Sequence, residues 1–216
     1  MVLLIQQEGE IMQENIYGEY QPVLEEILSE TLDRLEEIKD DYQDKTGDRL
    51  YEHLIGRVKT PASMIEKCQR KDLPLNGHSA LKENKDSIGV RIVCNFIDDI
   101  YTWIDIIEHL NNVEIVKQKD YITHAKPNGY RSYHLILEVT YPVADIDGND
   151  PGQYYIEVQL RTIAMDTWAS LEHEMKYKHT INNPEMIGQE LKRVADELAS
   201  CDVSMQTIRQ LIREDD

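Results

Sequence analysis

Three segments with strand character follow one another between residues 113 and 161 with no helical pattern between them, and this order constrains the fold most. They are Val113–Ile122, Tyr133–Thr140 and Tyr154–Arg161. Another run rich in β-branched residues, Ile88–Ile97, comes earlier and is followed by helical periodicity over Asp98–Leu110. Neighbouring strands without intervening helices indicate a mixed sheet, not a doubly wound parallel one. The sequence therefore predicts an α+β fold, in which a mixed β-sheet is flanked by helices.

Apolar residues spaced three and four apart predict further helices on both sides of these strands. These helices are Glu19–Lys45, Pro61–Lys71, Thr162–Lys178 and Pro184–Ile212. No internal repeat or long linker interrupts the chain. We divide it into a loosely ordered N-terminus (1–18), an N-terminal helical extension (19–50), a central domain (51–180) and a C-terminal helical extension (181–216).

The chain is strongly acidic, with 41 acidic and 23 basic residues and a net charge of −18. Broad coating of nucleic acid requires positive surface and is therefore excluded, whereas one local basic pocket is compatible with this charge. No segment approaches the roughly 20 apolar residues of a membrane span, and Met1–Ile5 is too short for a signal peptide. Three cysteines without paired spacing indicate reduced thiols. We expect a cytoplasmic protein.

Basic residues cluster against this acidic background. The cluster and its polar neighbours comprise Arg57, Lys59, Ser63, Lys67, Arg70, Lys71 and, inside an apolar strand, Arg91. Three- and four-residue spacings place several of them on one face of the predicted helix from Pro61. A basic helix face is most often simply solvated. Concentrated cations in an acidic molecule are, however, what a bound polyphosphate requires.

Two carboxylates lie beside or within predicted strands. Asp86 precedes the strand that begins at Ile88, and Glu157 lies inside the strand that leads to Arg161 and the next helix. Phosphoryl transfer uses a divalent ion, typically Mg²⁺, held by one or two carboxylates, together with a base for the attacking hydroxyl. Asp86 and Glu157 could share this work. On spacing alone, a capping Asp and a salt-bridged Glu are the commoner explanation for these two residues.

The segment Lys126–His134 places base-reading groups in a turn between two strands. Asn128 offers an amide, Tyr130 an aromatic ring, and Lys126 and Arg131 positive charges. An amide can read the edge of a base, and a tyrosine ring can stack on its face. Lys119 lies close enough along the predicted hairpin to meet a phosphate. An ordinary decorated hairpin remains the alternative.

Together these motifs resemble the (p)ppGpp synthetase domain of the RelA/SpoT family, and most closely its short members, the small alarmone synthetases. The resemblance covers Gly56–Lys178 and rests on four ordered motifs. They are Gly56–Lys59 with Ser63 and Lys67, Asp86–Ile92, Lys126–His134, and Glu157–Thr162 with Trp168–His173. It implies a nucleotidyltransferase-like mixed sheet. It also implies transfer of the β,γ-pyrophosphate of ATP to the 3′-hydroxyl of GDP or GTP, with AMP released.

The resemblance also implies roles for individual residues. On the donor side, Arg57 and Arg91 would sandwich the adenine, and the ATP phosphates would be held by Lys59, Ser63, Lys67 and Arg70. Mg²⁺ would be bound by Asp86 and Glu157, with Glu157 also the base for the 3′-hydroxyl. On the acceptor side, Tyr130 would stack on guanine while Asn128 and the Ala169 backbone read its edge. The acceptor's phosphates or ribose would meet Lys119, Lys126 and His134, with support from Gln159 and Arg161.

Longer relatives carry a hydrolase half with a His-Asp metal motif, and no His-Asp dipeptide occurs here. We therefore expect synthesis without hydrolysis, and independence from the ribosome. The resemblance implies a homo-oligomer, with a tetramer favoured, built from the terminal helices. The alternative is that these helices pack on their own sheet.

Two other functions remain open from the sequence. The same chemistry could act on tRNA or on adenine nucleotides, as in toxin-type relatives, although an acidic surface disfavours a large RNA. The chain could also be a catalytically silent nucleotide or RNA sensor, which the intact carboxylates and basic motif disfavour. The sequence does not decide between GDP and GTP.

Overall fold

The computed structural model describes residues 15–178 and 183–215 and contains a five-stranded mixed sheet. In spatial order the strands are β1 (His53–Val58), β2 (Ile88–Cys94), β5 (Gly152–Thr162), β4 (Tyr133–Tyr141) and β3 (Val113–Asp120). β2 and β5 run parallel, and the other neighbouring pairs are antiparallel. The predicted α+β mixed sheet is confirmed. The sequence predicted four of these strands within a few residues of their observed ends.

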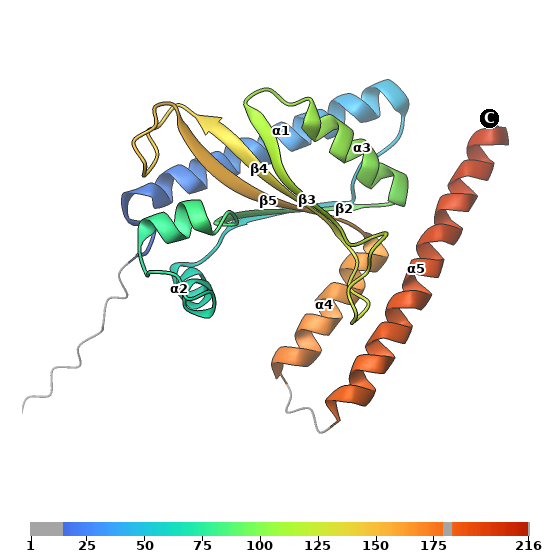
Figure 1. Cartoon of the computed structure of the whole chain (residues 1–216). Coiled ribbons are helices and arrows are strands. Elements are labelled where there is room, and N and C mark those ends of the chain that lie inside the picture. Colours follow the sequence, from blue (N-terminus) through green and yellow to red (C-terminus); the bar gives the residue numbers. More distant parts are fainter. Residues whose placement is uncertain (1–14, 179–182, 216) are drawn as a thin grey trace, which may run out of the picture.

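Helices cover the two faces of the sheet unequally. Their bounds are α1 (Gln21–Thr46), α2 (Pro61–Arg70), α3 (Ile97–Glu108), α4 (Ile163–Lys178) and α5 (Pro184–Asp215), with short helical turns at Gly18–Tyr20 and Ser79–Glu83. Figure 1 shows α1 and α3 on one face, and α2 and α4 at opposite ends of the other face. In the described part of the chain, no helix covers the middle of that second face. Within the described residues, none of the helices has the length and apolar character needed to cross a bilayer.

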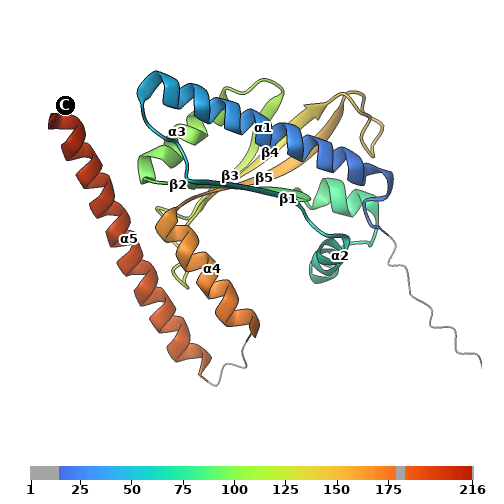
Figure 2. The ribbon, with the colours of Figure 1, turned by 180° about the vertical axis from the view of Figure 1, so that it is seen from behind.

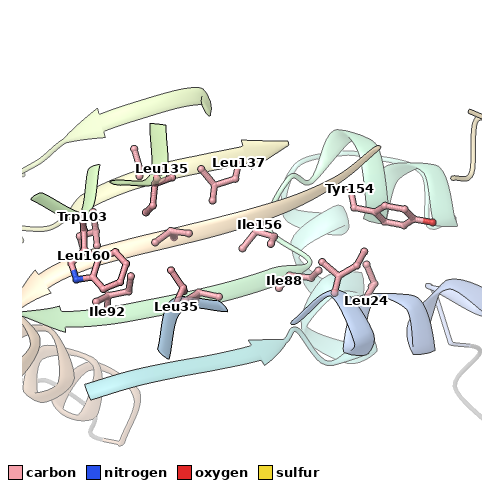
Figure 3. Packing of buried hydrophobic residues seen from close by; sticks show 14 of the residues in the cluster. Leu24, Leu35, Ile88, Ile92, Trp103, Leu135, Leu137, Tyr154, Ile156 and Leu160 are labelled. Carbon is pink, nitrogen blue, oxygen red and sulfur yellow. The ribbon is translucent and has the colours of Figure 1, made fainter. Parts of the chain in front are cut away.

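The main core lies between the sheet and the α1/α3 layer. Alternate residues of the central strands point into it, among them Ile88, Ile156 and Leu160, and they pack beside Leu35 of α1 and Trp103 of α3 (Figure 3). Burying apolar side chains from several elements in one layer is the main force holding such a fold together. Because strand side chains alternate, the intervening residues of the same strands face the opposite side.

The edge strand β1 was missed by the sequence analysis. Its residues alternate between exposed and half-buried with none fully buried, and Gly56 has low strand propensity, so no strong apolar pattern marked it. Pairing with β2 makes it a strand, with Arg57 opposite Gly89 in the register. The predicted strand Ile88–Ile97 was also too long, since α3 already begins at Ile97.

The expected loose order of residues 1–18 falls largely outside the described residues. Within them, Ile16 and Tyr17 are buried in the core, and the Tyr17 hydroxyl donates to the Lys59 carbonyl oxygen at 2.8 Å. This segment therefore packs under the chain that leads from β1 into α2. Local periodicity could not predict it because the contacts are long-range.

The terminal helices differ in how they are used. α1 buries Leu24, Ile27 and Leu35 against its own sheet. α5 runs beside α4 and on towards the first turn of α3 (Figure 2), where the Arg209 guanidinium forms an ion pair with Asp99 at 2.5 Å. The α1 stripe thus serves the chain's own core, whereas part of α5 leaves apolar side chains exposed.

We expect Gly56→Ala to lower the free energy of unfolding by about 1–3 kcal/mol relative to Gly89→Ala, because extra atoms in a packed layer are costly. A Cβ at Gly56 would lie 2.6 Å from a methyl carbon of Leu28 and 3.0 Å from Leu32, whereas at Gly89 the nearest atom is 4.0 Å away. The unfolded-state gain of a glycine-to-alanine change is common to both variants and cancels. Urea denaturation of the two variants measures the difference, and equal midpoints would contradict the expected packing of α1 on β1.

Candidate active site

Polar side chains of all five strands share the face of the sheet that α1 and α3 leave uncovered. The register sets Glu157 of β5 beside Gly89 of β2, and Gln159 of β5 between Arg91 of β2 and His134 of β4. Residues two apart in a strand lie on one face, so these groups point to the same side. Charged side chains from segments far apart in the sequence are thereby brought together.

Two cavities on this face share the same two carboxylates. The arginine pocket, about 270 Å³, is lined by Ile55, Arg57, Lys59, Asp86, Gly89, Val90, Arg91, Glu157 and Gln159. The lysine pocket, about 220 Å³, is lined by Lys67, Lys71, Glu83, Lys85, Asp86, Lys117, Lys119, His134, Ile136 and Glu157. Asp86 and Glu157 belong to both, so they stand at the boundary between two cation-lined spaces. A third cavity, about 240 Å³ under α1, has mostly apolar walls and does not provide the concentrated charge that a nucleotide requires.

Asp86 is held by two lysines. Its Oδ2 accepts hydrogen bonds from Lys59, at 2.5 Å, and from Lys67. Burial lowers the pKa of the Lys59 ammonium, and the hydrogen bond and charge of Asp86 oppose that shift. The other oxygen, Oδ1, is buried and has no hydrogen-bond partner among the described residues. A buried carboxylate oxygen of this kind costs free energy unless a ligand satisfies it.

The polar neighbours of Glu157 stabilise its ionised form. Its Oε1 lies 3.2 Å from Nδ1 of His134, and its Oε2 accepts from Gln159 at 3.0 Å. Burial would raise the pKa of Glu157, but the hydrogen bond and charge of His134, the Gln159 amide and the charge of Lys67 together lower it to about 2. The side chain is therefore a carboxylate at every physiological pH, which suits a metal ligand.

The two carboxylates fit a magnesium ion. Among the described residues, no group of three or more His, Cys, Asp and Glu side chains is arranged to hold a metal. Mg²⁺ does not need one, because it is commonly held by one or two carboxylates and keeps water or substrate oxygens as its other ligands. The unpartnered Oδ1 of Asp86 and the ionised Glu157 in the same pockets supply oxygen donors of this type.

Aromatic rings surround the turn before β4. The Tyr121 ring lies 6.0 Å from that of Tyr130 and 5.4 Å from that of His134, and the Lys126 ammonium lies over both tyrosines at 4.6 and 4.5 Å. Gly129, with φ +92°, forms the turn, and its amide donates to the Lys126 carbonyl at 2.8 Å. Tyr121 was missed by the sequence analysis, although an aromatic directly after a strand bearing Lys119 was a usable signal.

The structure sorts the predicted site residues into three groups. Nine line the pockets: Arg57, Lys59, Lys67, Asp86, Arg91, Lys119, His134, Glu157 and Gln159. Of the pockets' other cations, Lys71 belongs to the basic cluster identified in the sequence but was given no individual role, and Lys85 and Lys117 were not predicted. Ser63 and Arg70 lie on α2 without lining either pocket, and the Ser63 backbone amide donates to the capping Thr60 hydroxyl at 3.3 Å.

The third group lies around the turn and under α5. The Asn128 amide donates to Glu172 at 3.2 Å, and its oxygen accepts from the Tyr130 backbone. Ala169 is buried beside Trp168 in a small cluster with α5. Neither Asn128 nor Ala169 lines the two pockets. Asn128 contacts the Tyr130 backbone, and Tyr130 packs against the cluster that contains Ala169.

A family model described as "Region found in RelA / SpoT proteins" matches residues 56–182, more than half of the chain. The chain belongs to the RelA/SpoT family. It is 40% identical over 159 residues to the GTP pyrophosphokinase YwaC of Bacillus subtilis, covering 74% of each chain. Among solved structures, it is similar to small alarmone synthetase 1 of B. subtilis bound to its product pppGpp, with a TM-score of 0.76 and 34% identity over 88% of this chain and 94% of that one.

The same synthetase bound to AMPCPP gives a TM-score of 0.72 at 31% identity, covering 90% of this chain and 96% of that one. The RelA/SpoT match spans β1 to α4, and therefore every residue that lines the arginine and lysine pockets except Ile55. The family resemblance inferred from the four motifs is confirmed, and the chain groups with the small alarmone synthetases.

Proposed function

We propose that this chain is a GTP pyrophosphokinase that transfers the β,γ-pyrophosphate of ATP to the 3′-hydroxyl of GDP or GTP, forming ppGpp or pppGpp and AMP. The observation that carries this proposal is that Asp86 and Glu157 line both cation-rich pockets. A transfer between two nucleotides needs the reacting groups to meet at one boundary. No His-Asp dipeptide occurs in the chain, and the proposal does not include hydrolysis or dependence on the ribosome.

ATP occupies the arginine pocket in this proposal. Arg57 and Arg91, on the paired strands β1 and β2, sandwich the adenine, since guanidinium planes stack on aromatic bases. The triphosphate extends towards Lys59 and Lys67, with Ser63 and Arg70 of α2 at the outer edge. An ATP analogue bound to a solved relative supports a donor site in this fold.

GDP or GTP occupies the lysine pocket and the adjoining turn. Lys119 and His134 meet the phosphates or ribose, and Lys126 lies next to Tyr130, which stacks on guanine. Asn128 and the Ala169 backbone read the base edge, and Tyr121 adds a second ring beside the stacking position. A product-bound relative supports an acceptor site of this kind.

Mg²⁺ would be held by Asp86 and Glu157, where it would neutralise charge on the transferred pyrophosphate. The 3′-oxygen of the acceptor forms a bond to the β-phosphorus of ATP, and the bond from that phosphorus to the bridging α–β oxygen breaks. AMP leaves with that oxygen, and the hydroxyl proton passes to Glu157. The lysines around Asp86 orient the phosphates and offset their charge.

Incubating the chain with γ-labelled ATP, Mg²⁺ and one acceptor at a time tests this function. We expect the label on GDP or GTP, with AMP formed in equal amount. Label on tRNA or on an adenine nucleotide alone would instead favour the toxin-type reaction. Nucleotide binding without transfer would leave the sensor function.

We expect added pppGpp to leave the initial rate within about twofold of its basal value. Some relatives are activated by their product through basic residues on the first helix. Here that helix carries Asp33, Glu36 and Glu37, and of its cations Arg34 donates to the Asn111 carbonyl while Lys39 pairs with Asp40 at 2.8 Å. A polyphosphate is repelled by such a surface. A several-fold rise in rate, measured at saturating ATP and GDP, would contradict this prediction.

The proposal includes assembly of this chain into a homo-oligomer, with a tetramer favoured. The C-terminal half of α5 carries five apolar side chains, each more than half exposed: Val203, Met205, Ile208, Leu211 and Ile212. Large apolar side chains exposed together on one helix typically mark an interface. A second copy of this chain is the partner that the resemblance to small alarmone synthetases suggests.

We expect Ile208→Asp combined with Leu211→Asp to reduce the molar mass measured by light scattering after size-exclusion chromatography. Two carboxylates in a desolvated apolar contact are expected to cost more than the contact gains. Gln210→Asp, on the same exposed turn, adds charge without removing an apolar side chain and is the control. Wild type and double variant eluting with one mass would rule out this α5 interface.

A further inference from the structure

Asp166, in the first turn of α4, joins two arginines of the site although it belongs to none of the motifs identified in the sequence. Its Oδ1 accepts from Nη1 of Arg91 at 3.2 Å and from Nη1 of Arg161 at 2.9 Å. Asp166 is 21% exposed at its side chain and Arg161 only 7%. A half-buried carboxylate thus holds two guanidinium groups at one oxygen.

The two arginines serve different halves of the site. Arg91 lines the arginine pocket, where the proposed function puts the adenine of ATP. Arg161 donates through Nη2 to the Tyr130 hydroxyl at 3.0 Å and to Gln159 at 2.9 Å, and its guanidinium carbon lies 5.4 Å from the centre of the Tyr130 ring. Tyr130 is the residue proposed to stack on guanine.

From Arg161 the contacts continue to the reacting centre. The Tyr130 hydroxyl lies 2.8 Å from Nε2 of His134, and Nδ1 of His134 lies 3.2 Å from Glu157. Arg161 donates to the Tyr130 hydroxyl, this hydroxyl contacts Nε2 of His134, and Nδ1 of His134 donates to the ionised Glu157. An unbroken set of polar contacts therefore runs from the donor pocket to the catalytic carboxylate.

The charges explain why Asp166 is needed. Arg91 is set beside Gln159 in the β2–β5 register and Arg161 beside Val93, so the two cations lie on one face of the sheet with a single residue pair, Ile92 and Leu160, between these two pairs. Burial lowers the pKa of Arg91, the charge of Arg161 lowers it further, and Asp166 opposes both effects. The Nε atoms of both arginines are buried without a partner among the described residues. Without the carboxylate, like charges would drive the two side chains apart.

We propose that Asp166 is a positioning residue that couples the binding of ATP to the binding of the acceptor nucleotide, an inference that rests on the proposed function. Adenine held against Arg91 fixes that guanidinium against Asp166. The same oxygen then fixes Arg161, and through it Tyr130. Each nucleotide lowers the ordering cost of the other site, and by linkage the effect is reciprocal.

Calorimetry of GDP binding with and without AMPCPP tests the coupling. The α–β methylene bridge of AMPCPP cannot be cleaved in this transfer, so both nucleotides can be present without turnover. We expect saturating AMPCPP to tighten GDP binding by about fivefold or more in the wild type, within the usual range of such couplings. The coupling ratio is the Kd of GDP without AMPCPP divided by its Kd with saturating AMPCPP. In Asp166→Asn this ratio should fall below about twofold, because the amide keeps the shape of the side chain but not its charge.

Two further variants make the result specific. Asp166→Glu, which restores the charge, should recover part of the ratio. Thr167→Ala is the matched control, since Thr167 lies on the same turn, is exposed, and donates only to the Ile163 carbonyl oxygen at 2.8 Å; it should keep the wild-type ratio. Arg161→Lys should lose coupling like Asp166→Asn, which keeps the test decisive if the Asp166 variant does not fold.

The outcomes separate this inference from the proposed function. Binding of both nucleotides and synthesis of (p)ppGpp, together with an unchanged ratio in folded Asp166→Asn, would overturn the positioning role alone. A coupling ratio near one in the wild type would also overturn the positioning role, because there would be no coupling for Asp166 to mediate. Failure of the wild type to bind either nucleotide would overturn the proposed function itself.

Discussion

Glu157→Gln should lower kcat for (p)ppGpp synthesis by about 10³-fold or more, since it removes both a metal ligand and the proton acceptor. Glutamine keeps the shape of the side chain and can still meet His134 and Gln159, so the fold should be retained. The matched control is Glu138→Gln. Glu138 lies on β4 on the same face of the sheet, accepts from the Tyr155 hydroxyl at 2.8 Å, and lines neither pocket. We expect it to stay within about threefold of the wild type.

The pKa of Glu157 adds a second test of the same residue. Because the folded value, about 2, lies below the ordinary value of 4.5, ionised Glu157 favours the folded state above pH 4.5, and this contribution is lost as the pH falls towards 2. Wild type should therefore lose stability below about pH 4.5 more steeply than Glu157→Gln. Between pH 5 and 8 the rate should show no titration of Glu157. If the loss of stability at acid pH shifted in Glu138→Gln and not in Glu157→Gln, the assignment of this titration to Glu157 would be wrong.

A catalytically competent Glu157→Gln would remove the central element of the mechanism. The product is measured by chromatography of labelled nucleotides, with the melting temperature as the check on folding. If both glutamine variants lost activity equally, the loss would reflect the sheet and not the carboxylate.

Asp86→Asn should separate nucleotide binding from turnover. In the folded chain Asp86 accepts from Lys59 and Lys67, and removing its charge leaves two ammonium groups uncompensated beside the phosphate site. In EDTA, AMPCPP should then bind at least as tightly as to the wild type, since free lysines attract phosphate. With Mg²⁺, kcat should fall by about 10³-fold, because one of two metal carboxylates is gone.

Controls for this variant use a distant aspartate and the metal itself. Asp105→Asn, exposed on α3 across the sheet, should leave both binding and turnover unchanged. EDTA should abolish wild-type synthesis, and added Mg²⁺ should restore it. A variant at Asp86 that kept wild-type turnover at equal Mg²⁺ would remove Asp86 from the proposed metal site. Weaker AMPCPP binding in EDTA would show that the lysines depend on Asp86 for their position.

The sequence by itself determined the mixed sheet and most of the chemistry. β-branched runs and alternation identified β2, β3, β4 and β5, and three- and four-residue spacings identified the helices, because periodicity is a local property of the chain. The residue types of the ordered motifs indicated a polyphosphate site with two carboxylates. The family resemblance supplied the nucleotides.

Only the tertiary structure decided which side chains meet. The edge strand β1 exists because β2 offers it a partner, and the parallel register of β2 with β5 brings Glu157 to the side of Asp86. The packing of α2 places Lys71, directly after the helix, in the wall of the lysine pocket, while Arg70 lines neither pocket. Asp166 joins Arg91 and Arg161 from the start of another helix. Such contacts join residues up to 75 positions apart, and a local pattern carries no information about pairings at that range.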